Sequence, residues 1–165
     1  MRILGIDPGY GTLGYGVIVT NGSVSKALSY GAIVTPKTSQ FPARLKFIGE
    51  QIEMLIAKFD PDVIAVEELF FQNNQKTAIM VAEARGVVLY IAESSRAKLY
   101  EYTPLQIKQA MTGYGRATKI QVQEMVKQFL ELDKIPKPDD AADALAVALT
   151  HAQTNTRLSS IYGIK

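Results

Sequence analysis

Acidic residues occur at the edges of otherwise apolar segments in three separate parts of the chain. Asp7 closes the run RILGID, Glu67 closes the run DVIAVE, and a third segment, DDAADALAVALTH, carries Asp140 and Asp143 among alanine, valine and leucine. Carboxylates that converge from different segments are costly unless a cation neutralises them. Because the chain has no cysteine and a single histidine, a zinc site is disfavoured, and the expected ions are the hard, oxygen-preferring Mg²⁺ or Mn²⁺.

Four carboxylates of this kind can hold two metal ions, which suggests phosphodiester hydrolysis. Two ions roughly 3.5–4 Å apart activate a water and stabilise the leaving oxygen of an in-line displacement. The charge distribution points to a nucleic acid as the substrate. Residues 95–127 carry six lysines and arginines against two glutamates, a local charge of +4, although the whole chain carries only +2.

Each acid also has an ordinary structural explanation when it is taken alone. Asp7 could form the turn that precedes a Pro-Gly pair, and Glu67 or Glu68 could mark the point where a strand leaves the core. Asp139 follows a proline and is best interpreted as a helix N-cap, and Asp140 alone could favour the same helix end. None of these explanations accounts for acids at the edges of three apolar segments at once.

The glycines that follow Asp7 match a nucleotide-binding motif in sequence, but not in the secondary structure expected around them. Residues 5–16 read GIDPGYGTLGYG and contain a literal G-x-G-x-x-G at Gly9, Gly11 and Gly14. A dinucleotide site needs a strand that leads into a helix, whereas here a β-branched segment ends in Asn21-Gly22, a strong hairpin signal. We therefore expect a strand–turn–strand, in which Gly9 and Gly11 keep bulk away from the metal and the phosphate.

The elements that must position the acids follow from the apolar periodicity. Side chains alternate along a strand, so Asp7 shares a face with Ile3 and Gly5, and Glu67 shares one with Val63 and Ala65. Asp140 and Asp143 are three residues apart and lie on one face of a helix. The pattern predicts strands at 2–7, 14–20, 24–35, 62–67 and 99–103, and helices at 42–59, 77–95, 104–111, 119–132 and 140–152. The fold class is therefore α/β, with a five-stranded mixed sheet flanked by helices.

The length of 165 residues suits one domain, which we assign to residues 1–153, with residues 154–165 as a C-terminal tail. The lone His151 is expected near the C-terminus of its helix, away from the metal. The absence of cysteine fits a reducing compartment, and no apolar stretch is long enough for a membrane span. A cytoplasmic protein without a membrane partner is expected.

Four segments together resemble the RuvC family of bacterial Holliday junction resolvases: GIDPGYGTLGYGVI, AVEELFFQNN, ARG at 84–86, and DDAADALAVALTH. They occur in the family's order and spacing and cover nearly the whole chain. The resemblance implies a ribonuclease H-like fold, a homodimer, and paired symmetric nicks in a four-way DNA junction with Mg²⁺. It also implies that the catalytic, metal-binding carboxylates are Asp7, Glu67, Asp140 and Asp143.

The resemblance extends to residues that contact DNA. Lys108 and Lys119 match DNA-contacting lysines of the family, and Arg116 lies in the basic loop 112–118 between them. Phe70 matches an aromatic residue that stacks on junction bases, with ordinary core packing as the alternative. The family's partners are the branch-migration proteins RuvA and RuvB.

Other functions remain as alternatives. A YqgF-like RNA-processing nuclease has a similar opening, but the long 77–95 helix and the 112–118 loop favour RuvC. An actin-like ATPase needs two such domains, and a junction-binding protein without catalysis would have lost an acid. The helix at 77–95 carries more apolar side chains than one sheet face can cover, so it predicts a two-fold dimer.

Overall fold

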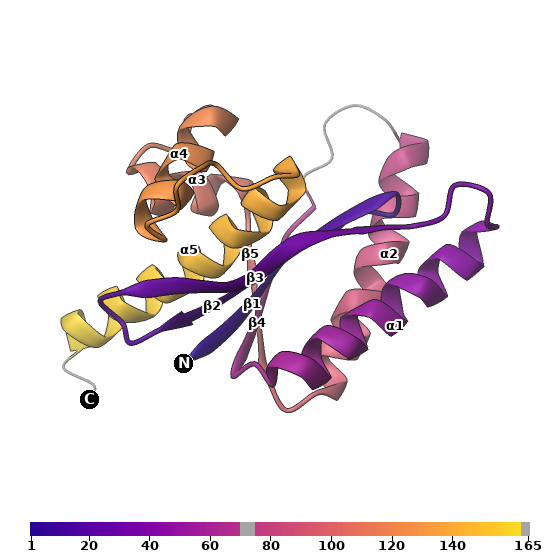
Figure 1. Cartoon of the computed structure of the whole chain (residues 1–165), viewed down its shortest axis with the longest axis horizontal. Helices are drawn as coiled ribbons and strands as arrows, with labels where there is room; N and C mark the ends of the chain where they lie inside the picture. Colours follow the sequence, from indigo (N-terminus) through magenta and orange to yellow (C-terminus); the bar gives the residue numbers. More distant parts are fainter. Residues whose placement is uncertain (70–74, 163–165) are drawn as a thin grey trace.

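The computed structural model describes the backbone of residues 1–69 and 75–162, and the side chains of residues 1–69 and 77–154. Five strands form one mixed sheet in the order β3-β2-β1-β4-β5 (Figure 1). β1 pairs antiparallel with β2 and parallel with β4, so the predicted sheet is confirmed. The strands are β1 (Arg2–Asp7), β2 (Thr12–Thr20), β3 (Ser25–Val34), β4 (Val63–Glu67) and β5 (Lys98–Tyr102).

Helices cover both faces of the sheet (Figure 1). One face packs against α1 (Phe41–Phe59) and α2 (Gln75–Ser94). The other packs against α3 (Pro104–Thr112), α4 (Lys119–Phe129) and α5 (Asp139–Tyr162). None of these helices, over the residues described, is long and apolar enough to cross a membrane.

The two faces divide the residues of β1 by simple alternation. Leu4 and Ile6 are fully buried on the side of α1 and α2, whereas Ile3 is buried on the side of α5. β4 lies in register with β1, with Ile3 beside Val63. Asp7 and Glu67, the last residues of their strands, therefore belong to the face that α5 covers.

The hairpin predicted at Asn21-Gly22 joins β2 to β3. Asn21 Oδ1 accepts hydrogen bonds from the backbone N–H groups of Ser23 at 3.0 Å and Val24 at 2.8 Å. Gly22 has a φ of 97°, which glycine adopts without steric cost. The glycine pattern of residues 9–14 leads into β2, which begins at Thr12. A dinucleotide site would need a helix there, so the structure contradicts one.

Most helix ends lie within two residues of the prediction, but the C-terminal ends of α4 and α5 do not. α4 ends at Phe129 rather than at residue 132, because Glu131 takes a left-handed backbone conformation with φ of 51°. α5 was expected to end at residue 152 but continues to Tyr162, past the start of the expected tail. Its sequence holds no proline or glycine to stop it before Gly163. His151 therefore lies inside the helix, and its expected place near the C-terminus is wrong.

Candidate active site

Asp7 and Glu67 meet where two neighbouring strands end. β1 and β4 are parallel and in register, and their last residues point toward the same face of the sheet. The two carboxyl groups are close enough that, in addition to burial, the charge of Glu67 raises the pKa of Asp7. The structure therefore places the two acids at one edge of the sheet.

α5 brings the other two acids because glycines let it lie directly on the sheet. A Cβ at Gly14 would stand 2.0 Å from the carbonyl oxygen of Asp140, and one at Gly5 would stand 2.1 Å from that of Ala144. Gly14 is also the partner of Asp7 across β1 and β2. Asp140, in the first turn of α5, therefore lies against Gly14, the residue beside Asp7, and any larger side chain at Gly14 would push the helix away from the sheet.

The acids are close enough to perturb one another strongly. Burial, followed by the charge of Glu67, raises the pKa of Asp7 to about 8. The charges of Asp143 and Asp140 contribute to the same rise. Burial, followed by the charge of Asp143, raises the pKa of Glu67 to about 7. Acids from the sheet and from α5 thus converge on one negatively charged site.

Lys119 supplies a counter-charge from α4. Its Nζ lies 2.7 Å from Asp143 and 3.8 Å from Asp139. Burial raises the pKa of Asp143 above its ordinary value, although the hydrogen bond from Lys119 opposes the rise. Asp139, interpreted from the sequence as an N-cap, is the first residue of α5 and pairs with Lys137 at 2.6 Å as well.

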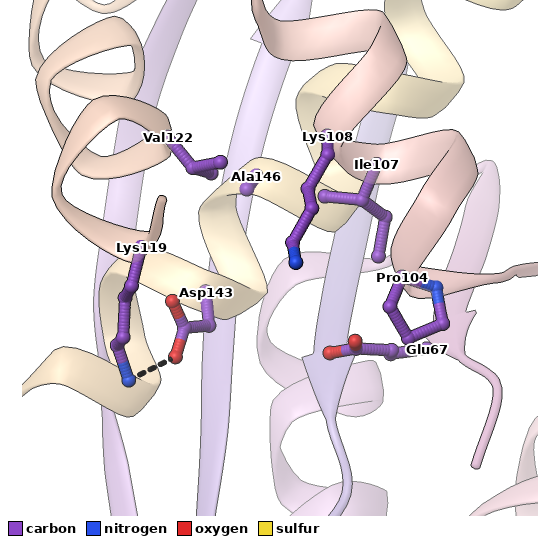
Figure 2. A pocket seen from close by; sticks show the side chains of 8 residues that line it. All are labelled: Glu67, Pro104, Ile107, Lys108, Lys119, Val122, Asp143 and Ala146. Atoms are coloured by element: carbon purple, nitrogen blue, oxygen red, sulfur yellow. Dashed lines mark ion pairs between the residues drawn. The ribbon is translucent and has the colours of Figure 1, made fainter. Parts of the chain in front are cut away.

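A cavity of about 280 Å³ opens beside this cluster (Figure 2). Glu67 and Asp143 face it from β4 and α5, and Lys108 and Lys119 reach into it from α3 and α4. The remaining lining residues are Pro104, Ile107, Val122 and Ala146. The cavity therefore presents acids and lysines together, as recognition of an anionic substrate beside a cation would require.

The donor chemistry of the site fits a hard divalent cation. Among the described residues, the oxygens that converge here are those of carboxylates, and burial together with their mutual repulsion raises the pKa values of Asp7 and Glu67. Among the residues that the structure describes, no three acidic or histidine side chains are gathered closely enough to hold an ion as they stand. Asp143 is paired with Lys119, so a cation and this lysine would compete for the same carboxylate.

The turn after Asp7 is fixed by its own contacts. Thr35 Oγ1 donates to the carbonyl of Tyr10 at 2.8 Å, and Arg44 Nη2 donates to the same carbonyl at 3.2 Å. A Cβ at Gly9 would lie 2.0 Å from the carbonyl oxygen of Thr12, whereas one at Gly11 would make only an ordinary contact with Arg44 at 3.5 Å. Gly9 is therefore required by the turn itself.

Comparison with known proteins identifies the family. The family model described as crossover junction endodeoxyribonuclease RuvC matches residues 3–151. The chain belongs to the RuvC family.

Similarity extends over the whole chain. The RuvC of Alkaliphilus oremlandii is 54% identical over 154 residues, 93% of this chain and 94% of that protein. The RuvC of Alkaliphilus metalliredigens is 50% identical over 165 residues, all of both chains. The structure of Thermus thermophilus RuvC in complex with Holliday junction substrate has a TM-score of 0.87 at 34% identity, covering 97% of this chain and 98% of that one.

Membership in the RuvC family confirms the predicted family, the ribonuclease H-like fold and the class of enzyme, a nuclease. It also decides between the alternatives drawn from the sequence. Neither the YqgF-like nuclease nor the actin-like ATPase fits a family model that spans residues 3–151.

The residues predicted to contact DNA lie in different surroundings. Lys108 reaches into the cavity, and Arg116 is exposed in the loop between α3 and α4. Lys119 is paired with Asp143, so the carboxylate partly neutralises the charge that it could offer to DNA. Phe70 lies outside the residues that the structure describes.

Sequence reasoning missed two groups around the RuvC site. Arg85 Nε lies 3.3 Å from the backbone carbonyl oxygen of Glu67, and the only available signal was its place in the ARG segment. The hydroxyl of Tyr102, the neighbour of Glu67 in β5, is hydrogen-bonded to His151 Nδ1 at 2.7 Å. His151 is a core residue, 4% exposed, and burial lowers its pKa.

Proposed function

We propose that the chain is a metal-dependent endonuclease that resolves four-way (Holliday) DNA junctions by paired symmetric nicks, in homologous recombination and DNA repair. The observation that carries the proposal is the convergence of acids from β1, β4 and α5 beside a cavity lined by two lysines. The bound junction in the similar Thermus thermophilus structure supports the choice of substrate.

Asp7, Glu67, Asp140 and Asp143 would hold the metal. Mg²⁺ is the proposed ion, two per site, with Mn²⁺ as a substitute. When bound, such ions activate a water and stabilise the leaving oxygen of the phosphodiester. The chain itself contributes the geometry: the strands hold Asp7 and Glu67 side by side, and the contact between Gly14 and Asp140 sets the depth of the helix.

Lysines that line the cavity would bind the DNA backbone. Lys108 is directed into the cavity, where a phosphate near Glu67 would meet it. Lys119 pairs with Asp143, so it would compete with a metal ion for this carboxylate. With Asp143 bound to metal, Lys119 would be available to a phosphate. Arg116 and Phe70 are proposed as further contacts, the first with phosphate and the second by stacking on a base.

A homodimer would supply one active site for each of two strands. One exposed face of α2, here called the α2 outer face, is formed by residues at helical spacing: Ile79, Glu83, Gly86 and Tyr90. Ile79 and Tyr90 are 61% and 75% exposed, and a Cβ at Gly86 would meet no atom within 4 Å. A glycine inside a helix is unfavourable, and close approach of a second α2 at Gly86 would explain it.

RuvA and RuvB are proposed as partners on the basis of the family alone, and the cytoplasmic localisation stays a prediction. The central proposal can be tested by incubating the protein with a labelled four-way junction and Mg²⁺, beside a linear duplex of the same sequence. We expect two symmetric nicks in the junction and none in the duplex. Asp7→Asn should bind the junction without cutting it. Equal cutting of both DNAs, or substantial nicking by folded Asp7→Asn, would contradict the proposal.

A further inference from the structure

The peptide that joins Glu67 to Glu68 is held from both sides. The N–H of Glu68 donates to the carbonyl of Tyr102 on β5 at 2.8 Å. The carbonyl of Glu67 accepts from Arg85 Nε on α2 at 3.3 Å. The plane of this peptide sets the direction in which the Glu67 side chain leaves the backbone, so both contacts act on the position of the carboxylate.

Strand pairing alone cannot hold the Glu67 carbonyl. The register between β1 and β4 ends with Ile6 beside Val66, and Pro8, which follows Asp7, has no N–H with which to extend it. A partly buried carbonyl at a strand end is best satisfied by another donor. Arg85 supplies that donor from a helix on the opposite face of the sheet.

Arg85 is itself held in place. Its side chain is only 18% exposed, and its guanidinium pairs with Glu101, the residue before Tyr102 on β5. A guanidinium offers several donors in one rigid plane, so one group can bind the Glu101 carboxylate and the Glu67 carbonyl together. The side chain thereby connects α2, β4 and β5 at the edge of the active site.

We propose that Arg85 is a positioning residue of this nuclease, which acts through the backbone of Glu67 to direct its carboxylate toward Asp7 and α5. The inference rests on the proposed metal role of Glu67. Contacts that orient a metal ligand without touching the metal commonly change metal affinity or activity by 10–100-fold, roughly, when they are removed.

The competing explanation is that Arg85 only ties α2 to β5 through its ion pair with Glu101. Two variants separate these roles. Arg85→Met removes both contacts with little change in length, and Glu101→Gln removes the ion pair while leaving the donor to Glu67. Arg85→Lys keeps a cation and a donor of similar reach, so it should recover part of the function.

The test measures Mn²⁺ binding to the full chain by calorimetry, together with amide hydrogen exchange at Glu68. We expect Arg85→Met to weaken Mn²⁺ binding by about 10–100-fold and to speed exchange of the Glu68 amide. Glu101→Gln should change Mn²⁺ binding by less than about threefold, and Arg85→Lys should fall between. Junction binding without divalent metal should be the same in all four proteins.

Mn²⁺ binding by folded Arg85→Met within about twofold of the parent protein would overturn the inference, as would an equal loss in Glu101→Gln. If Arg85→Met does not fold, the comparison of Arg85→Lys with Glu101→Gln decides in the same way. Glu67→Gln tests the underlying assignment: unchanged Mn²⁺ binding there would contradict the proposed metal site, whereas a loss there without a loss in Arg85→Met would contradict only the role of Arg85.

Discussion

Gly14 and Asp140 are in direct contact across the interface between the sheet and α5. A Cβ at Gly14 would lie 2.0 Å from the Asp140 carbonyl oxygen and 3.1 Å from the Asp140 Cβ. Backbone atoms of a helix cannot move aside as a flexible side chain can. The distance between the acids of the helix and those of the sheet is therefore set by the absence of one methyl group.

Gly14→Ala is expected to displace the start of α5. The overpacking should lower the free energy of unfolding by about 1–3 kcal/mol and weaken Mn²⁺ binding, because Asp140 and Asp143 move away from Asp7. Gly11→Ala is the matched control for stability, since its added methyl makes only an ordinary contact with Arg44. Denaturant unfolding of both variants, and Mn²⁺ calorimetry of Gly14→Ala beside the parent protein, check the prediction; equal stability of the two variants would contradict it.

The raised pKa values of Asp7 and Glu67 predict how stability depends on pH without divalent metal. Both acids are protonated more readily in the folded chain, with pKa values of about 8 and about 7. Their contribution to stability is therefore complete below about pH 4 and is lost as the pH rises toward 8. Between pH 6 and pH 9, roughly, the protein in chelator should lose on the order of 1–3 kcal/mol of its free energy of unfolding.

Asp7→Asn provides the control for this pH dependence. Asparagine cannot ionise, so the variant should be as stable as the parent or more so at about pH 9 and should show a flatter slope. The comparison is needed because His151, whose pKa is lowered by burial, changes stability in the opposite direction near its ordinary pKa of 6.5. Identical slopes in the two proteins would mean that Asp7 is ionised in both the folded and unfolded states.

The α2 outer face predicts a dimer that a single charge can weaken. Tyr90→Glu should raise the dimer dissociation constant by roughly 10–100-fold, because the partner helix would have to bury an unpaired carboxylate. Leu28→Glu is the control, since Leu28 is also an exposed apolar residue but lies on β3, at the other edge of the sheet. Sedimentation equilibrium measures the dimer dissociation constant of both variants. A parent protein that is monomeric at micromolar concentration would exclude this dimer.

Binding of the junction should depend on salt through the lysines of the cavity. Each phosphate contact contributes about −0.9 to the slope of log K against log salt concentration. Lys108→Ala should therefore flatten the slope by about one unit per subunit, whereas Lys26→Ala, which removes an exposed lysine on β3, should not. An unchanged slope with reduced nicking in Lys108→Ala would place this lysine beside the reacting phosphate instead.

The strands, and the sheet face that each of Asp7 and Glu67 joins, could be predicted because they follow from local periodicity. Alternation along β1 and β4 decides which face each acid joins, and the hairpin at Asn21 fixes the strand that follows. These features depend on residues close together in the sequence. The resemblance then connected them with the two aspartates of α5.

What could not be predicted depends on contacts between distant segments. Gly14 reads as part of a glycine-rich turn, and only its contact with Asp140 shows that it controls the depth of a helix. Arg85 reads as a helix-surface cation until its distance to the Glu67 carbonyl is known. Likewise, the pairing of Lys119 with Asp143 joins two helices whose relative positions no periodicity fixes.

The place of α5 in the chain has a consequence for biosynthesis. α5 follows all five strands in the sequence, yet it contacts every one of them and carries Asp140 and Asp143. A chain is synthesised from its N-terminus, so the strands with Asp7 and Glu67 leave the ribosome well before the helix that completes the set. Until α5 docks, one face of the sheet is uncovered and the four acids are not assembled. A nascent chain, or one cut short before residue 139, would therefore lack the assembled acids needed to cleave DNA.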